Sequence, residues 1–282
     1  MEYTKLLPPH VERMVGENDL YLEEYEGAGS PEISGAKLPL LFVHGAYTGS
    51  WMWSKFIPHF IGGGWKCYAM NLRSHYKSRV MDMTKITFED YLEDVKEIIS
   101  VVKEECGTAP VIIGFSLGGI LCQKLAETEE LHGMVLIDSC MCREVNAIAP
   151  YDALIENNFG MVVPAPVRDK CPGIDESLED IAFQIKYLSM EAAQALLACG
   201  CWIKGIEGIP VDSRFLTCPV LVIKAVNSDQ DDRRGRAEAE YFHAEYTGLW
   251  NTTHTGLLVG QRYQETANRV LVWLEEVFKR KE

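Results

Sequence analysis

The sequence predicts an α/β fold with a mostly parallel sheet, and two observations support that prediction. Strand-like runs and amphipathic helical segments alternate along the 282 residues, as they do where helices connect neighbouring parallel strands. Near the middle of the chain, a buried strand passes through a sharp turn into a helix between residues 111 and 126. The length suits one large domain with room for an inserted subdomain.

This turn contains the pattern G-x-S-x-G, with Ser116 at its centre. Glycine two residues before and after Ser116 lets the backbone bend sharply without a side-chain clash. The bend exposes Oγ of Ser116 above the carboxyl edge of the sheet and leaves the N–H of Leu117 near a helix N-terminus, facing a developing oxyanion. The pattern also occurs as a purely structural turn, but the flanking strand and helix favour a nucleophile.

The composition argues against several kinds of partner. A formal net charge of −14 disfavours binding to nucleic acid or to anionic lipid, since both need clustered Lys and Arg. No apolar run approaches the roughly 18 residues of a membrane span, and we expect no signal peptide. The nine irregularly spaced cysteines are expected to stay reduced, as in the cytoplasm. We expect a cytoplasmic protein that acts on a small-molecule substrate, and its oligomeric state is left open.

The chain is expected to begin with an antiparallel hairpin. Residues 11–15 and 20–25 are strand-like runs separated by a polar turn, and residues 27–37 have the composition of a loop. A buried strand at residues 38–43 then runs into His44-Gly45-Ala46. Further strands are expected at 65–70 and 133–138, with an amphipathic helix between them at 88–104.

A strand followed by His-Gly-Ala, the G-x-S-x-G turn and a late histidine occur in one order, and in this order they resemble the α/β-hydrolase fold family. Residues 71–78 are similar to a structural segment of that family, although Asn71, Ser74 and Tyr76 depart from its pattern. The resemblance covers nearly the whole chain. It implies an eight-stranded, mostly parallel sheet flanked by helices, with a helical cap inserted.

The resemblance also implies roles for residues near the turn. The N–H of Ala46 is expected to be the second oxyanion donor beside that of Leu117. Tyr47 and Phe115 are candidate substrate-binding residues because they adjoin the oxyanion loop and the nucleophile. His44 and His75 are expected to be structural.

Residues 139–217 interrupt the alternation of strands and helices. The next convincing strand, at 220–225, begins about eighty residues after Asp138, and a structureless loop of that length is implausible in a compact domain. Helical patterns occur at 153–158, 178–187 and 191–199. We therefore expect a hydrolase core of residues 1–138 and 218–282 and a helical cap, residues 139–217, over the active site.

The acid of a catalytic triad has several candidate positions. In the resembled family it lies a few residues after the strand that matches 220–225, where Asp229 fits best, followed by Asp231 and Asp232. The most common spacing of the family falls one residue earlier, on Ser228. Asp138 is the acid in some lineages, although a residue at this strand end is often a structural hydrogen-bonding group. The resemblance thus implies Asp229, with the others as alternatives.

The late histidine of the family is matched by His254. This residue lies in a loop after the expected last strand, 246–250, and before a closing helix, 263–278. The order Ser116, Asp229, His254 is the order in which the resembled fold carries its triad.

Together these residues imply a serine hydrolase of the carboxylesterase type. It would cleave an ester, lactone or thioester of a small to medium apolar substrate through an acyl-enzyme. Carbon–carbon bond hydrolysis, acyl transfer to an alcohol and a non-catalytic ligand receptor remain as alternatives. The mechanism requires neither a metal nor an organic cofactor. The pairs Cys140/Cys142 and Cys199/Cys201 are expected to pack as small apolar side chains.

Overall fold

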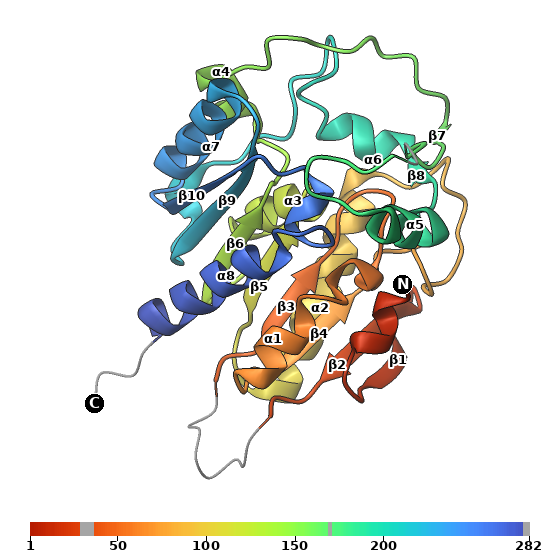
Figure 1. Cartoon of the computed structure of the whole chain (residues 1–282), viewed down its shortest axis with the longest axis vertical. Coiled ribbons are helices and arrows are strands. Elements are labelled where there is room, and N and C mark those ends of the chain that lie inside the picture. The colour runs from red at the N-terminus through yellow and green to blue at the C-terminus, as the bar shows by residue number, and fades with distance from the viewer. Residues whose placement is uncertain (29–36, 169–170, 279–282) are drawn as a thin grey trace.

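The computed structural model describes residues 1–28, 37–168 and 171–278. Its main sheet has eight strands in the spatial order β1-β2-β4-β3-β5-β6-β9-β10 (Figure 1). Strand β2 is antiparallel to both of its neighbours, and every neighbouring pair from β4 to β10 is parallel. The predicted sheet and its N-terminal hairpin are confirmed, whereas most of the loop expected at 27–37 lies outside the described residues. The strands are β1 (Val11–Val15), β2 (Leu20–Tyr25), β3 (Leu40–Val43), β4 (Cys67–Met70), β5 (Val111–Phe115), β6 (Gly133–Ile137), β9 (Val220–Val226) and β10 (Glu245–Trp250).

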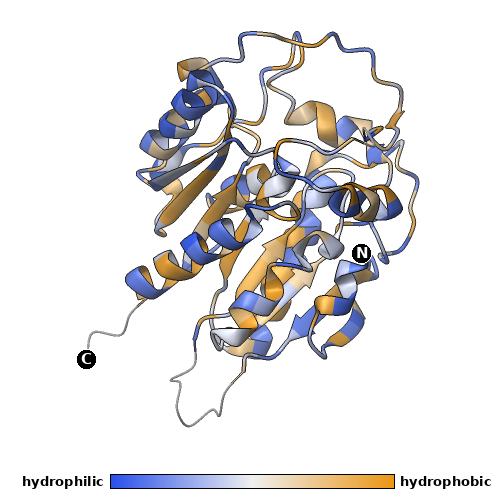
Figure 2. Ribbon diagram, viewed as in Figure 1, coloured by the Kyte–Doolittle hydropathy of each residue, from blue (hydrophilic) through white to orange (hydrophobic). Residues whose placement is uncertain are grey.

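Helices cover both faces of the sheet (Figure 1). Alternate side chains of a strand point to opposite faces, so Leu41 and Val43 of β3 join one core cluster while Leu40 and Phe42 join another. Figure 2 shows the corresponding pattern, with mostly hydrophobic strands and helices that are hydrophobic on one side. The first cluster lies under α2 (Phe88–Cys106), α3 (Leu117–Leu125) and α7 (Asp229–Tyr241), and the second under α1 (Ile57–Gly62) and α8 (Tyr263–Phe278).

Helix α2 shows how local sequence sets the bounds of an element. Thr87 caps its N-terminus and forms a capping box with Asp90, which satisfies backbone N–H groups of the first turn. Gly107 ends the helix in the left-handed conformation, with φ of 66°, which glycine adopts at little cost. The helix predicted at 88–104 is therefore confirmed with two further residues. No helix in the described part of the chain is both long and apolar enough to cross a membrane.

After β6 the chain leaves the sheet, and the helices α4, α5 and α6 of the segment 139–217 lie in the upper half of Figure 1. Strands β7 and β8 pair with each other as a short antiparallel ribbon separate from the main sheet. The helix expected at 178–187 is confirmed, whereas residues 191–199 begin as a strand before a shorter helix. This segment contains α4 (Arg143–Ile148), β7 (Val162–Val163), α5 (Leu178–Tyr187), β8 (Glu191–Ala192), α6 (Ala193–Ala198) and the 3-10 helix η3 (Ser213–Phe215).

The prediction of a helix at 153–158 is wrong, because the structure has no helix there. Ile155 instead forms an isolated bridge with Ile203, because its N–H donates to Trp202 and its carbonyl accepts from Lys204. Six residues are too few to sustain a helix without tertiary support. The apolar side chains of Leu154 and Ile155 in this stretch are 51% and 47% exposed, so they do not form a buried helical face.

Candidate active site

Ser116 occupies the sharp turn between β5 and α3. Its backbone has φ of 54° and ψ of −117°, a strained conformation for a residue with a side chain. The neighbouring glycine is required, because a Cβ on Gly118 would lie 2.4 Å from the carbonyl oxygen of Val43. This close approach presses the turn against the chain that leaves β3. The strained serine and the close packing match the geometry of a nucleophile turn.

The two predicted oxyanion donors come from the two segments that approach each other here, the start of α3 and the chain after β3. Leu117 is the first residue of α3, where a backbone N–H has no partner within the helix. Ala46 follows β3 by a few residues, and both Ala46 and Leu117 line the same cavity as Ser116. No backbone carbonyl among the described residues accepts a hydrogen bond from either N–H. Both groups can therefore donate to a substrate oxygen.

His254 pairs with Asp138 rather than with Asp229. Nδ1 of His254 lies 2.5 Å from Oδ2 of Asp138, and because a carboxylate only accepts, Nδ1 carries the proton. The ring of His254 also stacks on Phe115, with centroids 4.5 Å apart. Nε2 is then the nitrogen left for a proton from a nucleophile. No hydrogen bond joins Ser116 to His254 among the described residues, but both line the same cavity.

The prediction of Asp229 as the partner of His254 is corrected by this contact. Asp229 is the first residue of α7, which begins directly after the cap residue Ser228. Asp231 accepts from Ser228 and Arg234, and Asp232 accepts from Tyr246 and Arg236. Carboxylates in the first turn of a helix are stabilised by its N-terminal dipole. The acidic residues after β9 thus stabilise the N-terminus of α7.

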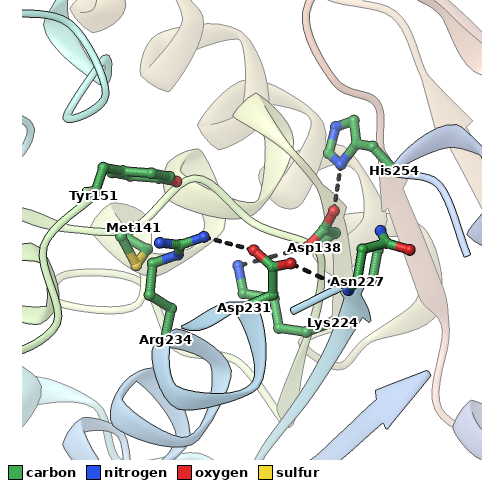
Figure 3. A pocket seen from close by; sticks show the side chains of 9 residues that line it. Asp138, Met141, Tyr151, Lys224, Asn227, Asp231, Arg234 and His254 are labelled. Atoms are coloured by element: carbon green, nitrogen blue, oxygen red, sulfur yellow. Dashed lines mark hydrogen bonds and ion pairs between the residues drawn. The ribbon is translucent and has the colours of Figure 1, made fainter. Parts of the chain in front are cut away.

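Asp138 lies next to His254 and close to other charged side chains (Figure 3). Nζ of the buried Lys224 lies 3.8 Å from Oδ1 of Asp138 and 3.1 Å from Oε2 of Glu238. Burial raises the pKa of the Asp138 carboxyl, but the charge and hydrogen bond of His254 and the charge of Lys224 outweigh it, so the pKa is lowered. Asp138 is therefore held ionised, as an orienting acid must be.

A small cavity of about 240 Å³ lies on this side of the pair, and Figure 3 shows the side chains that line it. Tyr151 and Arg234 border it, and the guanidinium of Arg234 lies over the Tyr151 ring while pairing with Asp231. The charges of its lining are paired with one another, so this cavity offers no unmatched charge to a ligand.

The larger cavity, about 560 Å³, lies on the Ser116 side of His254. Its volume is in the range of pockets for small molecules. The core contributes the turn, the oxyanion loop and His254, while the segment 139–217 contributes both apolar and polar side chains. The apolar ones are Ile155, Phe159, Pro166, Leu188, Leu196 and Trp202.

Both predicted substrate-binding residues, Tyr47 and Phe115, line this cavity. Burial and the nearby Glu191 carboxylate raise the pKa of Tyr47 to about 12, so its hydroxyl stays protonated. The N–H of Tyr47 donates to Oε2 of Glu191 at 2.9 Å. A residue of the segment 139–217 therefore holds the loop that carries Ala46, a link that the sequence did not indicate.

The carboxylate of Glu191 is fully buried and joins several core elements. It also accepts from Nε2 of His75 at 3.1 Å and from the Tyr91 hydroxyl at 2.6 Å. Burial lowers the pKa of His75, but the charge and hydrogen bond of Glu191 outweigh it, and the pKa is raised. His44 is buried as well and accepts from the N–H of Leu72. Neither histidine lines the cavity, as expected for structural residues.

Two neighbouring acidic residues, Asp175 and Glu176, bind the loop that carries His254. Asp175 accepts from the hydroxyl of Thr252 and from the N–H of Thr253. Glu176 accepts from the hydroxyls of Thr253 and Thr255 at 3.0 and 2.7 Å. The residues on both sides of His254 are thus fixed from the segment 139–217. No sequence signal pointed to this pair, because acidic residues in a loop are common.

Metal-ligating groups do not gather at the cavity. In the described ranges one group of candidate ligands occurs, His10, Glu12 and Glu23 on the N-terminal hairpin. Glu12 there accepts from Lys77, and Glu23 accepts from Tyr25. Among the closely spaced cysteines, burial raises the pKa of Cys142 and of Cys201 to about 12, so these thiols are protonated.

Comparison with known proteins agrees with this fold. Similar solved structures include a carboxylesterase of the thaumarchaeon Nitrososphaera gargenis, 17% identical with a TM-score of 0.66, with 96% of this chain and 99% of that chain covered. A monoacylglycerol lipase from Paleococcus ferrophilus is 17% identical with a TM-score of 0.65, covering 92% and 99%. A variant of tomato methylketone synthase I complexed with beta-ketoheptanoate is 16% identical with a TM-score of 0.65, covering 86% and 99%.

At these identities the structural likeness shows the fold alone. A search of curated proteins found no significant match. The sequence model of the alpha/beta hydrolase family, however, matches residues 40–269, which include Ala46, the sharp turn at Ser116 and His254. The chain belongs to the alpha/beta hydrolase family.

Proposed function

We propose that the protein is a serine hydrolase that cleaves the ester, lactone or thioester bond of a small to medium apolar substrate. One observation carries the proposal. Ser116, on a strained turn, and His254, paired with Asp138, line the same cavity. Such a set is recognised by its geometry and by the role of each group. The Asp138 assignment replaces Asp229 in the mechanism.

In the first step, Oγ of Ser116 attacks the carbonyl carbon and Nε2 of His254 takes the hydroxyl proton. Asp138 keeps the proton on Nδ1 and stabilises the imidazolium. The oxyanion accepts from the N–H groups of Ala46 and Leu117, and loss of one such donor typically costs ~2.7–4 kcal/mol. The intermediate then collapses, and the leaving alkoxide or thiolate takes the proton from Nε2.

In the second step, a water molecule attacks the acyl-enzyme. Nε2 of His254 takes one proton from this water and then returns it to Oγ of Ser116 as the acid leaves. Each group thereby regains its starting state. His254 relays every proton transfer in this cycle, and the backbone N–H groups of Ala46 and Leu117 stabilise each oxyanion.

The segment 139–217 acts as a cap in this proposal. Its apolar side chains, among them Phe159, Leu196 and Trp202, form one wall of the cavity and favour apolar substrate groups. Glu191 and the pair Asp175/Glu176 tie it to the oxyanion loop and to the His254 loop. The cap therefore contributes to substrate binding and also to the position of catalytic groups.

The test is mass spectrometry of the intact protein after treatment with a fluorophosphonate. Wild type is expected to gain one adduct, and Ser116→Ala none. Ser100→Ala, a change at an exposed helical serine, is the matched control and should label like wild type. Hydrolysis of p-nitrophenyl esters of graded chain length then gives the acyl preference. A folded wild-type protein that neither forms the adduct nor hydrolyses these esters would overturn the proposal.

A further inference from the structure

One wall of the larger cavity carries the charged side chain of Arg168. Nη1 of Arg168 donates to the hydroxyl of Thr255 at 3.1 Å, and Nη2 donates to Oε2 of Glu176 at 2.7 Å. All three residues line the cavity that contains Ser116. Because both terminal nitrogens contact residues of the cavity lining, the guanidinium lies at the cavity wall.

These two hydrogen bonds leave most donors of the guanidinium unused. A guanidinium carries five N–H groups in one plane, and Arg168 uses two of them within the described part of the chain. The side chain is 22% exposed. Its unpaired Nε is accessible, unlike Nε of Arg13 and of Arg262, which are enclosed without a partner. A ligand in the cavity can therefore accept a hydrogen bond from Arg168.

The carboxylate beside Arg168 is already saturated. Its oxygens receive hydrogen bonds from the side chains of Gln184, Arg168, Thr253 and Thr255, and an ionised carboxylate has about four acceptor positions. Burial raises the pKa of Glu176, but hydrogen bonds from Thr255 and Gln184 and the charge of Arg168 outweigh it, so the pKa is lowered. The unused N–H groups of Arg168 are therefore the charged donors that this wall offers to a ligand.

The charges around Arg168 favour a neutral ligand oxygen over an anion. Oε2 of Glu176 lies 2.7 Å from Nη2 of Arg168, so the carboxylate balances the guanidinium charge. An anionic ligand group bound to Arg168 would lie close to Glu176 and be repelled by it. An ether, hydroxyl or carbonyl oxygen accepts from the same N–H groups without this repulsion.

The position of Arg168 relative to His254 indicates which end of the substrate carries this oxygen. Nη1 of Arg168 bonds to Thr255, the residue directly after His254. In the proposed mechanism Nε2 of His254 gives its proton to the leaving group, so the guanidinium lies on the leaving-group side. The apolar side chains lie at the oxyanion loop instead, where Leu196, Phe159 and Trp202 pack with Ala46 and Tyr47.

We propose that Arg168 is a specificity-determining residue, which donates a hydrogen bond to a neutral oxygen in the alcohol part of the substrate. The favoured substrates are then esters of alkoxy or polyol alcohols with an apolar acyl chain. The proposal rests on the hydrolase function proposed above and names its substrate class. The acyl chain lies against the apolar side chains at the oxyanion loop, and the leaving alcohol lies between His254 and Arg168.

The experiment uses pairs of esters that differ by one oxygen atom in the alcohol. The 2-methoxyethyl, 3-methoxypropyl and 4-methoxybutyl esters are set against the butyl, pentyl and hexyl esters, in which a methylene replaces the ether oxygen. All carry the acyl chain that the p-nitrophenyl series shows to be preferred. The readout is the ratio of kcat/KM for the ether ester to kcat/KM for its alkyl partner.

Three variants locate the effect. Arg168→Met removes the donors, and for at least one pair the ratio should fall by about three- to tenfold, as for loss of one hydrogen bond. Arg168→Met/Glu176→Gln leaves no unpaired carboxylate and should show the same fall, even if the single variant is unstable. Arg143→Met is the matched control, because this arginine of the same segment pairs with Glu144 away from the cavity. It should keep the wild-type ratio.

Two further substrate series test the position and the charge of the oxygen. With the methoxy group at the end of the acyl chain, the ratio should be the same in wild type and in Arg168→Met. A fall in this series alone would contradict the leaving-group assignment. An ester with a carboxylate at the end of the alcohol should be a poorer substrate of wild type than the ether ester, and a preference for the carboxylate would overturn the neutral class.

Calorimetry with Ser116→Ala measures the same contact without hydrolysis. Adding Arg168→Met to this variant should lower the affinity for the ether ester, relative to its alkyl partner, by about the same factor. Ratios of kcat/KM and of affinity that do not change in the Arg168 variants would overturn the subsite and leave the hydrolase standing. No labelling and no hydrolysis, with the affinity ratio still dependent on Arg168, would overturn the hydrolase and leave the subsite.

Discussion

Asp138 and His254, 116 residues apart in the chain, form a hydrogen bond of 2.5 Å between Oδ2 and Nδ1. The carboxylate comes from the end of β6, where its backbone has φ of 42°, and the histidine from the loop after β10. The register of parallel strands brings these two loops to one edge of the sheet, since β6 pairs with β9 and β9 with β10. In the proposed mechanism this contact makes Asp138 the orienting acid, and it gives the first prediction.

Asp138→Asn should abolish most of the activity, whereas Asp229→Asn should not. An amide at position 138 can no longer hold the proton of His254 on Nδ1, and the same change in a serine protease triad lowers kcat by about 10⁴-fold. Asp229 is the first residue of α7. The Asp229→Asn variant should keep its activity within about twofold of wild type, because surface substitutions of this kind have small effects. Steady-state ester hydrolysis by both variants gives the measurement, and the reverse ranking would contradict the assignment.

Lys224→Met should destabilise the protein strongly. Lys224 is the buried cation between Asp138 and Glu238, and removal of one partner of a buried ion pair typically costs about 3–5 kcal/mol. In the double variant Lys224→Met/Glu238→Gln, the carboxylate of Glu238 no longer lies buried without its cation. Its loss in free energy of unfolding should therefore be smaller than the sum of the losses of the two single variants. Urea unfolding of the four proteins tests this. Additive costs would mean that the two groups are not coupled.

The free energy of unfolding should depend on pH through Glu191 and His75. Burial raises the pKa of Glu191, but His75 and Tyr91 outweigh it and lower the pKa below its ordinary 4.5. Its contribution is present above pH 4.5 and is lost as pH falls through the lowered value. The pKa of His75 is raised above its ordinary 6.5, so its contribution is present below pH 6.5 and is lost as pH rises through the raised value.

Glu191→Gln should therefore be most destabilising between these two ordinary values, with a smaller cost at lower and at higher pH. Urea unfolding of wild type and variant over a pH series measures the difference. Tyr91→Phe is the matched control, because it removes a hydrogen bond to Glu191 at 2.6 Å and keeps both charges. Its cost, about 1 kcal/mol, should vary less with pH. A pH-independent cost of Glu191→Gln would contradict the ion pair.

Gly256→Ala should disturb the loop of His254. A Cβ at position 256 would lie 2.1 Å from Oδ2 of Asp175, so the carboxylate that holds Thr252 and Thr253 must move. We expect a loss of about 1–3 kcal/mol in stability and a lower kcat. Gly62→Ala is the control, because a Cβ there meets nothing within 4 Å. Thermal unfolding and ester hydrolysis of both variants measure the effects, and equal behaviour would exclude a role for the Asp175 contact.

Most of the fold could be predicted because its signals are local. Apolar runs such as 111–115 predict buried strands, and the periodicity of residues 88–104 predicts a helix wherever the segment lies in the fold. The segment 139–217 was harder to predict. Residues 153–158 have helical periodicity, but the bridge between Ile155 and Ile203 depends on a partner about fifty residues away that no local pattern reveals.

The sequence by itself determined the family, the sharp turn at Ser116 and the late loop of His254, because glycine spacing and chain order can be read from consecutive residues. Only the tertiary structure decided which carboxylate faces His254. Asp138 and Asp229 both follow parallel strands, and the choice depends on whether the chain after each strand forms a turn or a helix. The roles of Glu191, Asp175 and Glu176 likewise became visible only in the fold, since hydrogen bonds between distant segments leave no periodic trace in the sequence.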